Sequence, residues 1–186
     1  LLCNTLPTTA ILVVLIITLA PISGAHFNPI VSLVFAFRQE LSLREAAAYI
    51  SLQVLGGVIG TMLAHAMFDL TLIEFSTKAR SGFPQWLSEA VAAFGLVAAI
   101  LLGVRFNKSA IPWLVGLFIA AAYWFTASTS FANPAVAIAR SLTDTFSGIR
   151  PGDLIGFIMS ETVGALLAYV FVSWMIHPRH MRSTVE

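Results

Sequence analysis

Two asparagines, Asn28 and Asn133, stand in matching sequence contexts that indicate a function. Each is followed directly by a proline, and the second copy comes 105 residues after the first. Asparagine is a good cap for the start of a helix and proline suits the first helical position, so a helix begins at each copy. The side-chain amide also carries N–H donors that can hydrogen-bond to a small polar solute. The chemistry expected here is recognition of a neutral molecule, without a reaction.

The helices predicted after these asparagines are short. They cover residues 30–37, which end before Arg38, and residues 135–142, which end before Asp144. A helix of about 8 residues is roughly 12 Å long, under half of the ~30 Å hydrocarbon core of a bilayer. Each copy also follows an apolar run without a charge. We therefore expect two half-helices that enter a membrane without crossing it.

Two half-helices that meet by their N-termini at the membrane centre each present about +0.5 of a charge there, which repels protons and cations. The backbone before each asparagine, residues 25–27 and 130–132, is not expected to be helical. Such backbone is stable at that depth only where its carbonyls face a polar lumen. The backbone carbonyls would then be hydrogen-bond acceptors along the path, and the amides of Asn28 and Asn133 would be two donors at its middle. This arrangement suits water and neutral molecules with hydroxyl groups.

The composition predicts a membrane protein and excludes several other classes. Of the 186 residues, 58% are hydrophobic and 10% are charged, which is less charge than a soluble domain of this size carries. The net charge of +1 offers no basic patch for nucleic acid. Cys3 is the sole cysteine, which excludes an internal disulfide and a cysteine-based metal site. With no phosphate loop, nucleophile elbow or zinc motif, we expect no enzyme, no cofactor and no bound metal.

The apolar runs predict membrane spans in a single channel domain that covers residues 1–186. The spans comprise about residues 8–25, 46–68, 86–104, 111–129 and 154–176. The basic residues divide into a group of six, Arg38, Arg44, Arg105, Lys108, Arg179 and Arg182, and a group of four, Lys78, Arg80, Arg140 and Arg150. Because basic residues favour the cytoplasmic side, the larger group and the C-terminus are expected in the cytoplasm.

An internal repeat extends beyond the two Asn-Pro sites. Residues 49–56 parallel residues 157–164 at an offset of 108, which defines a first repeat of about 1–68 and a second of about 86–176. Half-helices that enter from opposite faces require inverted repeats, with an odd number of spans in each. The second repeat has three predicted spans and the first has two. We therefore expect a further membrane helix ahead of Leu1, in a six-helix protein.

These features resemble the major intrinsic protein family, the aquaporins and aquaglyceroporins. The resemblance covers the whole chain and rests on residues 23–29, Asn133-Pro134-Ala135, Gln53 and Glu89. It implies a right-handed bundle of six helices with two half-helices that meet at the centre, assembled as a homotetramer in membrane lipid with a pore in each subunit. The central motif would be Asn28, Pro29 and Ile30 with Asn133, Pro134 and Ala135, although the family usually has alanine in place of Ile30.

The resemblance also implies roles for individual residues. Glu89 would hold carbonyl groups of a re-entrant loop, Glu161 would act likewise at the position that matches Gln53, and His26 would be a structural loop residue that could also gate the pore. The constriction would be formed by Thr8, Ala121, Ser130 and Val136. Almost all relatives have an arginine at the position of Val136. Since all four residues are small, we expect a wide constriction without a fixed charge.

Arg140 lies one turn beyond Val136 on the same expected helix face. It could partly substitute for the missing arginine by guiding oxyanions to the mouth of the pore. The plainer interpretation, which we favour, is an i, i+4 ion pair with Asp144 or contact with a lipid headgroup. Its replacement is then expected to change the flux of neutral solutes little.

Together these observations predict a passive channel for small uncharged solutes: glycerol-like polyols, water, and arsenite as neutral As(OH)3. The valine in place of arginine resembles a bacterial branch connected with arsenic resistance, which favours arsenite and the inner membrane of a bacterium. Three alternatives stay open: a water-selective channel, a proton-coupled transporter built on Glu89 and Glu161, and a structural protein without a pore. Saturable flux that depends on a pH gradient would favour the transporter, and linear flux the channel.

Overall fold

The computed structural model describes residues 1–177 as helices and loops, with no strand among them. The long helices are α1 (Leu2–Ser23), α3 (Leu43–Met67), α4 (Phe83–Phe106), α5 (Ile111–Phe125) and α7 (Leu154–Met175), and the half-helices are α2 (Pro29–Phe37) and α6 (Pro134–Arg140). Short 3₁₀ turns, η1 (Lys108–Ala110) and η2 (Pro151–Asp153), lead into α5 and α7. Five helical segments of the described chain are long and apolar enough to cross a membrane, which confirms the predicted all-α membrane fold.

Local sequence signals set the helix boundaries. Ser42 and Glu45 form a capping box, in which each side chain accepts a hydrogen bond from the backbone N–H of the other, and α3 therefore begins before the predicted residue 46. At the end of α1, Gly24 has a φ of 73°, in the left-handed region that glycine adopts without strain. α5 ends at Phe125, short of the predicted residue 129, because the chain turns there into the loop that leads to Asn133.

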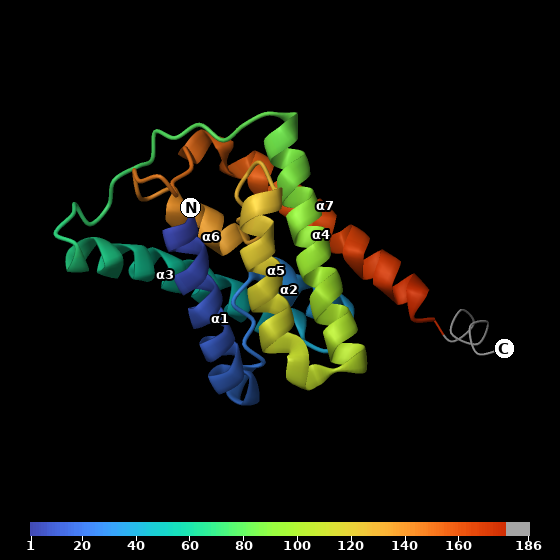
Figure 1. Cartoon of the computed structure of the whole chain (residues 1–186). Coiled ribbons are helices and arrows are strands. Elements are labelled where there is room, and N and C mark those ends of the chain that lie inside the picture. Colours follow the sequence, from blue (N-terminus) through green and yellow to red (C-terminus); the bar gives the residue numbers. More distant parts are fainter. Residues whose placement is uncertain (178–186) are drawn as a thin grey trace.

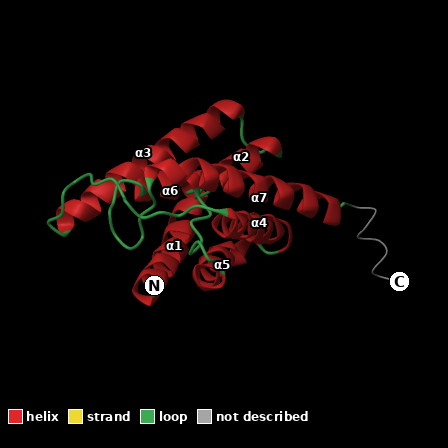
Figure 2. Cartoon of the chain, turned by 90° about the horizontal axis from the view of Figure 1, so that it is seen from above, coloured by secondary structure: helices red, strands yellow, loops and turns green. Residues whose placement is uncertain are grey.

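The two half-helices lie at the centre of the bundle. In Figure 1, α1, α5 and α4 stand side by side, while α3 and α7 run obliquely and project to opposite sides. In the view from above, α1, α4 and α5 lie along one side of α6 and α7, and α3 lies along the other (Figure 2). Each half-helix packs against both α3 and α7. Long helices from both repeats therefore enclose the half-helices.

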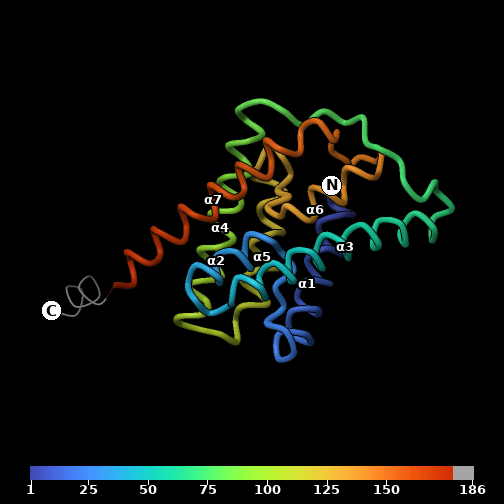
Figure 3. The backbone as a smooth tube through the Cα atoms, turned by 180° about the vertical axis from the view of Figure 1, so that it is seen from behind, coloured from blue at the N-terminus to red at the C-terminus, as the bar shows by residue number. Residues whose placement is uncertain are grey.

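A long loop between α3 and α4, residues 68–82, arches over one end of the bundle, as the view from behind shows (Figure 3). It is fastened to the segment that follows α6 by backbone hydrogen bonds, from Glu74 N–H to the Leu142 carbonyl (3.1 Å) and from Ser76 N–H to the Ser141 carbonyl (3.0 Å). His65, at the end of α3, is buried, and its Nε2 lies 2.8 Å from Oγ1 of Thr143. The loop thus forms a fixed rim around this end.

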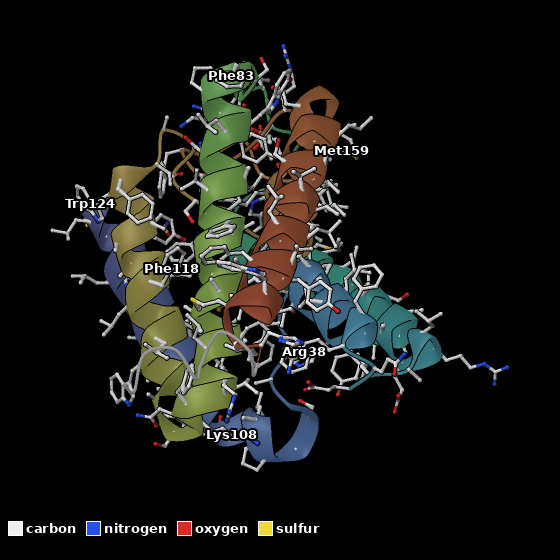
Figure 4. The ribbon with its side chains drawn as sticks, turned by 90° about the vertical axis from the view of Figure 1, so that its right-hand side faces the viewer. Arg38, Phe83, Lys108, Phe118, Trp124 and Met159 are labelled. Carbon is white, nitrogen blue, oxygen red and sulfur yellow. The ribbon has the colours of Figure 1, made fainter. Side chains whose placement is uncertain are left out.

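The two groups of basic residues lie at different ends of the bundle. Figure 4 shows Arg38 and Lys108 toward one end, and Phe83, where the long loop enters α4, at the other. Lys78 and Arg80 belong to that loop. The separation agrees with the predicted grouping, whereas the assignment of one end to the cytoplasm stays a prediction. Arg179, Arg182 and the C-terminal tail lie outside the described residues.

Small residues allow close helix contacts. A Cβ atom on Gly164 of α7 would lie 2.1 Å from the Ala90 carbonyl oxygen of α4, and one on Gly57 of α3 would lie 3.2 Å from Cβ of Ala139 on α6. A Cβ atom on Gly56, the repeat counterpart of Gly164, would meet no heavy atom within 4 Å in the described chain, apart from its chain neighbours and the backbone of its own helix. With Leu52, Gly56 lines an open apolar groove of about 1510 Å³ beside α1 and α3. The expectation of a further helix ahead of Leu1 stays a prediction.

We expect Gly164→Ala to destabilise the bundle, because α4 and α7 would have to separate to admit the added methyl group. Overpacking of this kind costs about 1–3 kcal/mol, and a backbone carbonyl cannot rotate away as a flexible side chain can. The control is Gly152→Ala, which adds the same group where the nearest atom, Nε of Arg150, is 4.0 Å away. The unfolding midpoints of both variants would be measured in detergent. Equal midpoints would contradict the close contact of α4 with α7.

Candidate functional site

The two asparagines cap the half-helices. Oδ1 of Asn28 accepts a hydrogen bond from Ile30 N–H at 3.1 Å, and Pro29 is the first residue of α2. Oδ1 of Asn133 accepts from Ala135 N–H at 3.0 Å and from Val136 N–H at 3.4 Å, in front of α6. Both asparagines are in the extended conformation that a capping residue adopts. The predicted starts of the two half-helices are confirmed.

The same asparagines tie the two re-entrant loops to each other. Nδ2 of Asn28 donates to the carbonyl of Ala132 at 2.6 Å, and Nδ2 of Asn133 donates to the carbonyl of Phe27 at 2.9 Å. Each amide group has two N–H donors, so one donor of each remains beyond these bonds. The two half-helix N-termini are therefore held together at the centre of the bundle by a reciprocal pair of hydrogen bonds.

Two buried carboxylates hold the second loop. Oε1 and Oε2 of Glu89 accept hydrogen bonds from Phe131 N–H (2.9 Å) and Ala132 N–H (2.6 Å). Oε1 of Glu161 accepts from Asn133 N–H at 2.9 Å. Glu89 was expected to hold carbonyl groups, but a carboxylate accepts hydrogen bonds, and the groups it binds are backbone N–H donors. Three consecutive backbone amides thus find their acceptors on α4 and α7.

The second loop is strained where these carboxylates bind it. Thr129, Ser130 and Ala132 have φ angles of 64°, 49° and 47°, in the left-handed region that residues with a side chain rarely adopt. Each such residue costs of order 1–3 kcal/mol and persists only where the surroundings determine it. The hydrogen bonds that Glu89 accepts from Phe131 N–H and Ala132 N–H help to hold this conformation. They turn the loop so that its asparagine reaches the other half of the bundle.

The first loop is held by neutral groups. Nε2 of Gln53 donates to the His26 carbonyl and to Oγ of Ser32, the latter at 3.0 Å. The His26 ring packs against Phe35 and Tyr49, with centroids 4.5 and 5.6 Å apart. These contacts are those of a structural residue, and the gating role of His26 stays a prediction.

A cavity of about 640 Å³ is lined by both asparagines and by residues from both ends of the bundle. Glu40 and Lys108 line one end, and Arg140 lines the other. The lining also includes Thr8, Ser130 and Val136, three of the four predicted constriction residues. Glu89 and Glu161 do not line it among the described residues, and both are fully buried.

Ala121 is a correction to the predicted constriction. It is exposed on α5 and does not line the cavity, whereas Ile119 and Tyr123 do. The resemblance places Ala121 by its distance of twelve residues from Asn133, and that distance does not fix the face of α5, because α5 ends at Phe125 and a loop follows. The apolar period Val115, Ile119 and Tyr123, four residues apart, is the signal that marks the inward face of α5.

The predicted ion pair between Arg140 and Asp144 is not formed. Oδ1 of Asp144 accepts hydrogen bonds from the Thr77 N–H at 2.9 Å and from the Thr77 hydroxyl at 3.1 Å. Nη2 of Arg140 instead donates to the hydroxyl of Tyr123 at 3.0 Å. The carboxylate of Asp144 is therefore bound by the long loop, and the guanidinium of Arg140 lies at the cavity instead.

The comparisons with known proteins agree with this geometry. The sequence profile of the family described as "Major intrinsic protein" matches residues 3–105. The chain belongs to the major intrinsic protein family. One relative within this family, "Aquaglyceroporin AqpS" of Rhizobium meliloti (strain 1021), is 63% identical over 175 residues, which cover 94% of this chain and 75% of that protein.

More distant relatives match shorter parts of their own length. "Aquaporin NIP3-1" of Arabidopsis thaliana is 29% identical over 170 residues, which cover 84% of this chain and 51% of that protein. "Glycerol uptake facilitator protein" of Bacillus subtilis (strain 168) is 29% identical over 114 residues, or 54% of this chain and 42% of that protein. The chain thus spans about half, or less, of these two members of the major intrinsic protein family.

We expect Asn28→Asp and Asn133→Asp to lower the flux of neutral solutes through this major intrinsic protein and to raise proton or cation leak. An aspartate still caps the helix, but it loses the N–H donor and sets an oxygen against the carbonyl of Ala132 or Phe27. Osmotic and proton fluxes in proteoliposomes measure both effects. Asn107→Asp is the control, because that side chain only accepts a hydrogen bond, from Ser109. Unchanged selectivity in either central variant would remove the asparagine pair from the mechanism.

Glu89→Gln is expected to loosen the second loop. The amide offers one acceptor oxygen for two backbone N–H groups and turns its own NH2 toward the other, at a cost of about 1–3 kcal/mol. Unfolding in detergent and water flux in vesicles would report the change. Glu45→Gln serves as control, since it alters an exposed capping box far from the cavity. If both variants lost the same stability, the loop-holding role of Glu89 would be contradicted.

Proposed function

We propose that the chain is a passive transmembrane channel for small uncharged solutes. The observation that supports it is a single cavity that is lined by Asn28 and Asn133 at the centre and by residues from both ends of the bundle. A solute there meets amide donors and the non-helical backbone of both loops, which replace water as hydrogen-bond partners. The channel needs no cofactor and catalyses no reaction.

Neutral solutes are favoured over cations by the electrostatics of the centre. Two capped helix N-termini face each other there, each with about +0.5 of a charge. The buried carboxylates do not face the path: Glu89 accepts hydrogen bonds from two backbone amides and Oε1 of Glu161 from a third, and neither residue lines the cavity among the described residues. A proton-coupled transporter built on these two residues would need them to face the solute. Their placement favours the channel over that alternative.

The range of solutes depends on the residues of the constriction. In this proposal these are Thr8, Ser130 and Val136, together with Tyr123, which lines the cavity from α5 where Ala121 does not. Val136 brings no charge and no side-chain donor to this level, so solutes larger than water fit it better than they fit an arginine-bearing constriction. The names of AqpS, an aquaglyceroporin, and of the Bacillus subtilis glycerol uptake facilitator favour glycerol-like polyols. We include arsenite as neutral As(OH)3 on the resemblance carried by Val136. A water-selective channel is the second candidate.

The proposed setting is the inner membrane of a bacterium, with the C-terminus in the cytoplasm and four chains in a homotetramer. Large apolar side chains cover the outside of the described bundle, and Figure 4 shows Trp124 pointing away from it. An exposed apolar surface of this kind suits lipid and neighbouring subunits. Cross-linking in native membranes would test the oligomeric state.

Val136→Arg tests the proposed constriction. The guanidinium adds volume, a permanent charge and up to five donors, so glycerol and arsenite flux should fall by about tenfold, a rise of about 1.4 kcal/mol in the barrier. Water flux should fall much less. Osmotic swelling of proteoliposomes measures all three solutes. Val136→Leu adds bulk without charge and is the matched control.

Two outcomes would contradict the proposal. Equal loss of water and glycerol flux in Val136→Arg would mean that Val136 does not set the constriction. Saturable flux that requires a pH gradient would favour the transporter. Linear flux that is indifferent to the gradient is the result expected of a channel.

A further inference from the structure

Arg140 occupies a special place at the mouth of the cavity. It is the last residue of α6, four residues and roughly 6 Å of helix beyond Val136. Its side chain lines the central cavity and also a second cavity of about 370 Å³ at the rim, whose lining includes Lys78 and Arg80. A solute that moves from the rim to Val136 therefore passes this guanidinium.

The guanidinium of Arg140 is held by neutral partners. Nη2 donates to the hydroxyl of Tyr123 at 3.0 Å, and Tyr123 is only 3% exposed. The guanidinium carbon also lies 4.4 Å from the ring centroid of Phe131, a cation–π distance. Within residues 1–177, no carboxylate is paired with it, because Asp144 is bound by Thr77. The charge is oriented toward the path without being neutralised.

The neighbouring arginine has a different task. Arg80 donates from Nε to the Gly148 carbonyl (2.7 Å) and from Nη1 to the Ser128 carbonyl (2.8 Å), and it is buried. Its donors are thus committed to holding the rim. The positive charges nevertheless act on each other: burial and then the charge of Arg140 lower the pKa of Arg80, and burial and then the charge of Arg80 lower the pKa of Lys78.

We infer that the guanidinium of Arg140, oriented by Tyr123 and Phe131, is an outer cation barrier of this pore, which acts one helical turn outward of Val136 and adds to the field of the half-helix N-termini at the centre. The inference rests on the proposed channel function, and it names Arg140 as a residue that gives the channel its selectivity against cations. The barrier no longer has to coincide with the narrowest point. A neutral solute passes the charge at the rim and then meets the uncharged side chain of Val136, whereas a cation is repelled before it enters.

Three substitutions test this in the full chain, reconstituted in vesicles. K⁺ permeability is read from the membrane potential set by a K⁺ gradient, and water and glycerol permeability from light scattering of the same vesicles. Arg140→Gln should raise K⁺ permeability at least tenfold and change water and glycerol permeability less than about twofold. Arg140→Lys should keep most of the barrier. Tyr123→Phe should raise K⁺ permeability by a smaller factor, because the charge remains but loses its orientation.

The matched control is Arg150→Gln, an exposed cation at the same rim that pairs with Asp153 at 2.9 Å and lines none of these cavities. It should leave K⁺ permeability unchanged. A second test returns the charge to the constriction: the double variant Val136→Arg with Arg140→Gln should restore K⁺ exclusion and lower glycerol flux. Restored K⁺ exclusion in the double variant would show that the leak of Arg140→Gln comes from the lost charge and not from a disrupted fold.

The outcomes separate the two proposals. Normal neutral flux together with unchanged K⁺ exclusion in Arg140→Gln would overturn the role of Arg140 and leave the channel intact. An equal rise in K⁺ permeability in Arg150→Gln would also overturn it, because the effect would then belong to rim charge in general. If the wild-type chain passed no neutral solute, the proposed channel function would fail, and this inference with it.

Discussion

The structure depends on one requirement: every backbone group of the two re-entrant loops must find a hydrogen-bond partner at membrane depth, where lipid offers none. The reciprocal bonds from Asn28 to the Ala132 carbonyl and from Asn133 to the Phe27 carbonyl meet this need across the centre. They fix the distance between the half-helices. The position of the cavity and the direction of the helix dipoles follow from that distance.

The two repeats meet the same requirement with different chemistry. The first loop is held by the neutral amide of Gln53, and the second by the carboxylates of Glu89 and Glu161. The second loop also lies beside the cationic rim, where Arg80 binds the Ser128 carbonyl. The two re-entrant loops therefore have similar backbone arrangements, but within the described chain charged side chains bind only the second. One mouth of the cavity is electrostatically distinct from the other.

Local signals in the sequence predict the parts of this site that depend on local contacts. The caps at Asn28 and Asn133 follow from the dipeptides alone, and the apolar runs predict the long helices to within a few residues at most boundaries. Contacts between distant segments were not predictable in this way. Asp144 is bound by Thr77, 67 residues away in sequence, and that contact frees Arg140. No pattern near residue 144 indicates it.

The inward face of α5 shows a related limit. The position of Ala121 was taken from the family resemblance, by its distance along the chain from Asn133, and a loop separates Asn133 from the end of α5 at Phe125. That distance does not fix the face of α5 on which a residue lies. The periodicity of α5 itself, which ends in Tyr123, does not depend on the loop and gives the correct face.

The strained second loop has a consequence for the energetics of permeation. Its conformation is imposed by bonds to α4 and α7 and does not depend on a solute for support. A solute that crosses exchanges its own hydrogen bonds along walls that are already in place, and no lid or domain has to move on the microsecond to millisecond scale. Permeation then needs no rearrangement of the second loop, and the solute only exchanges hydrogen-bond partners along it.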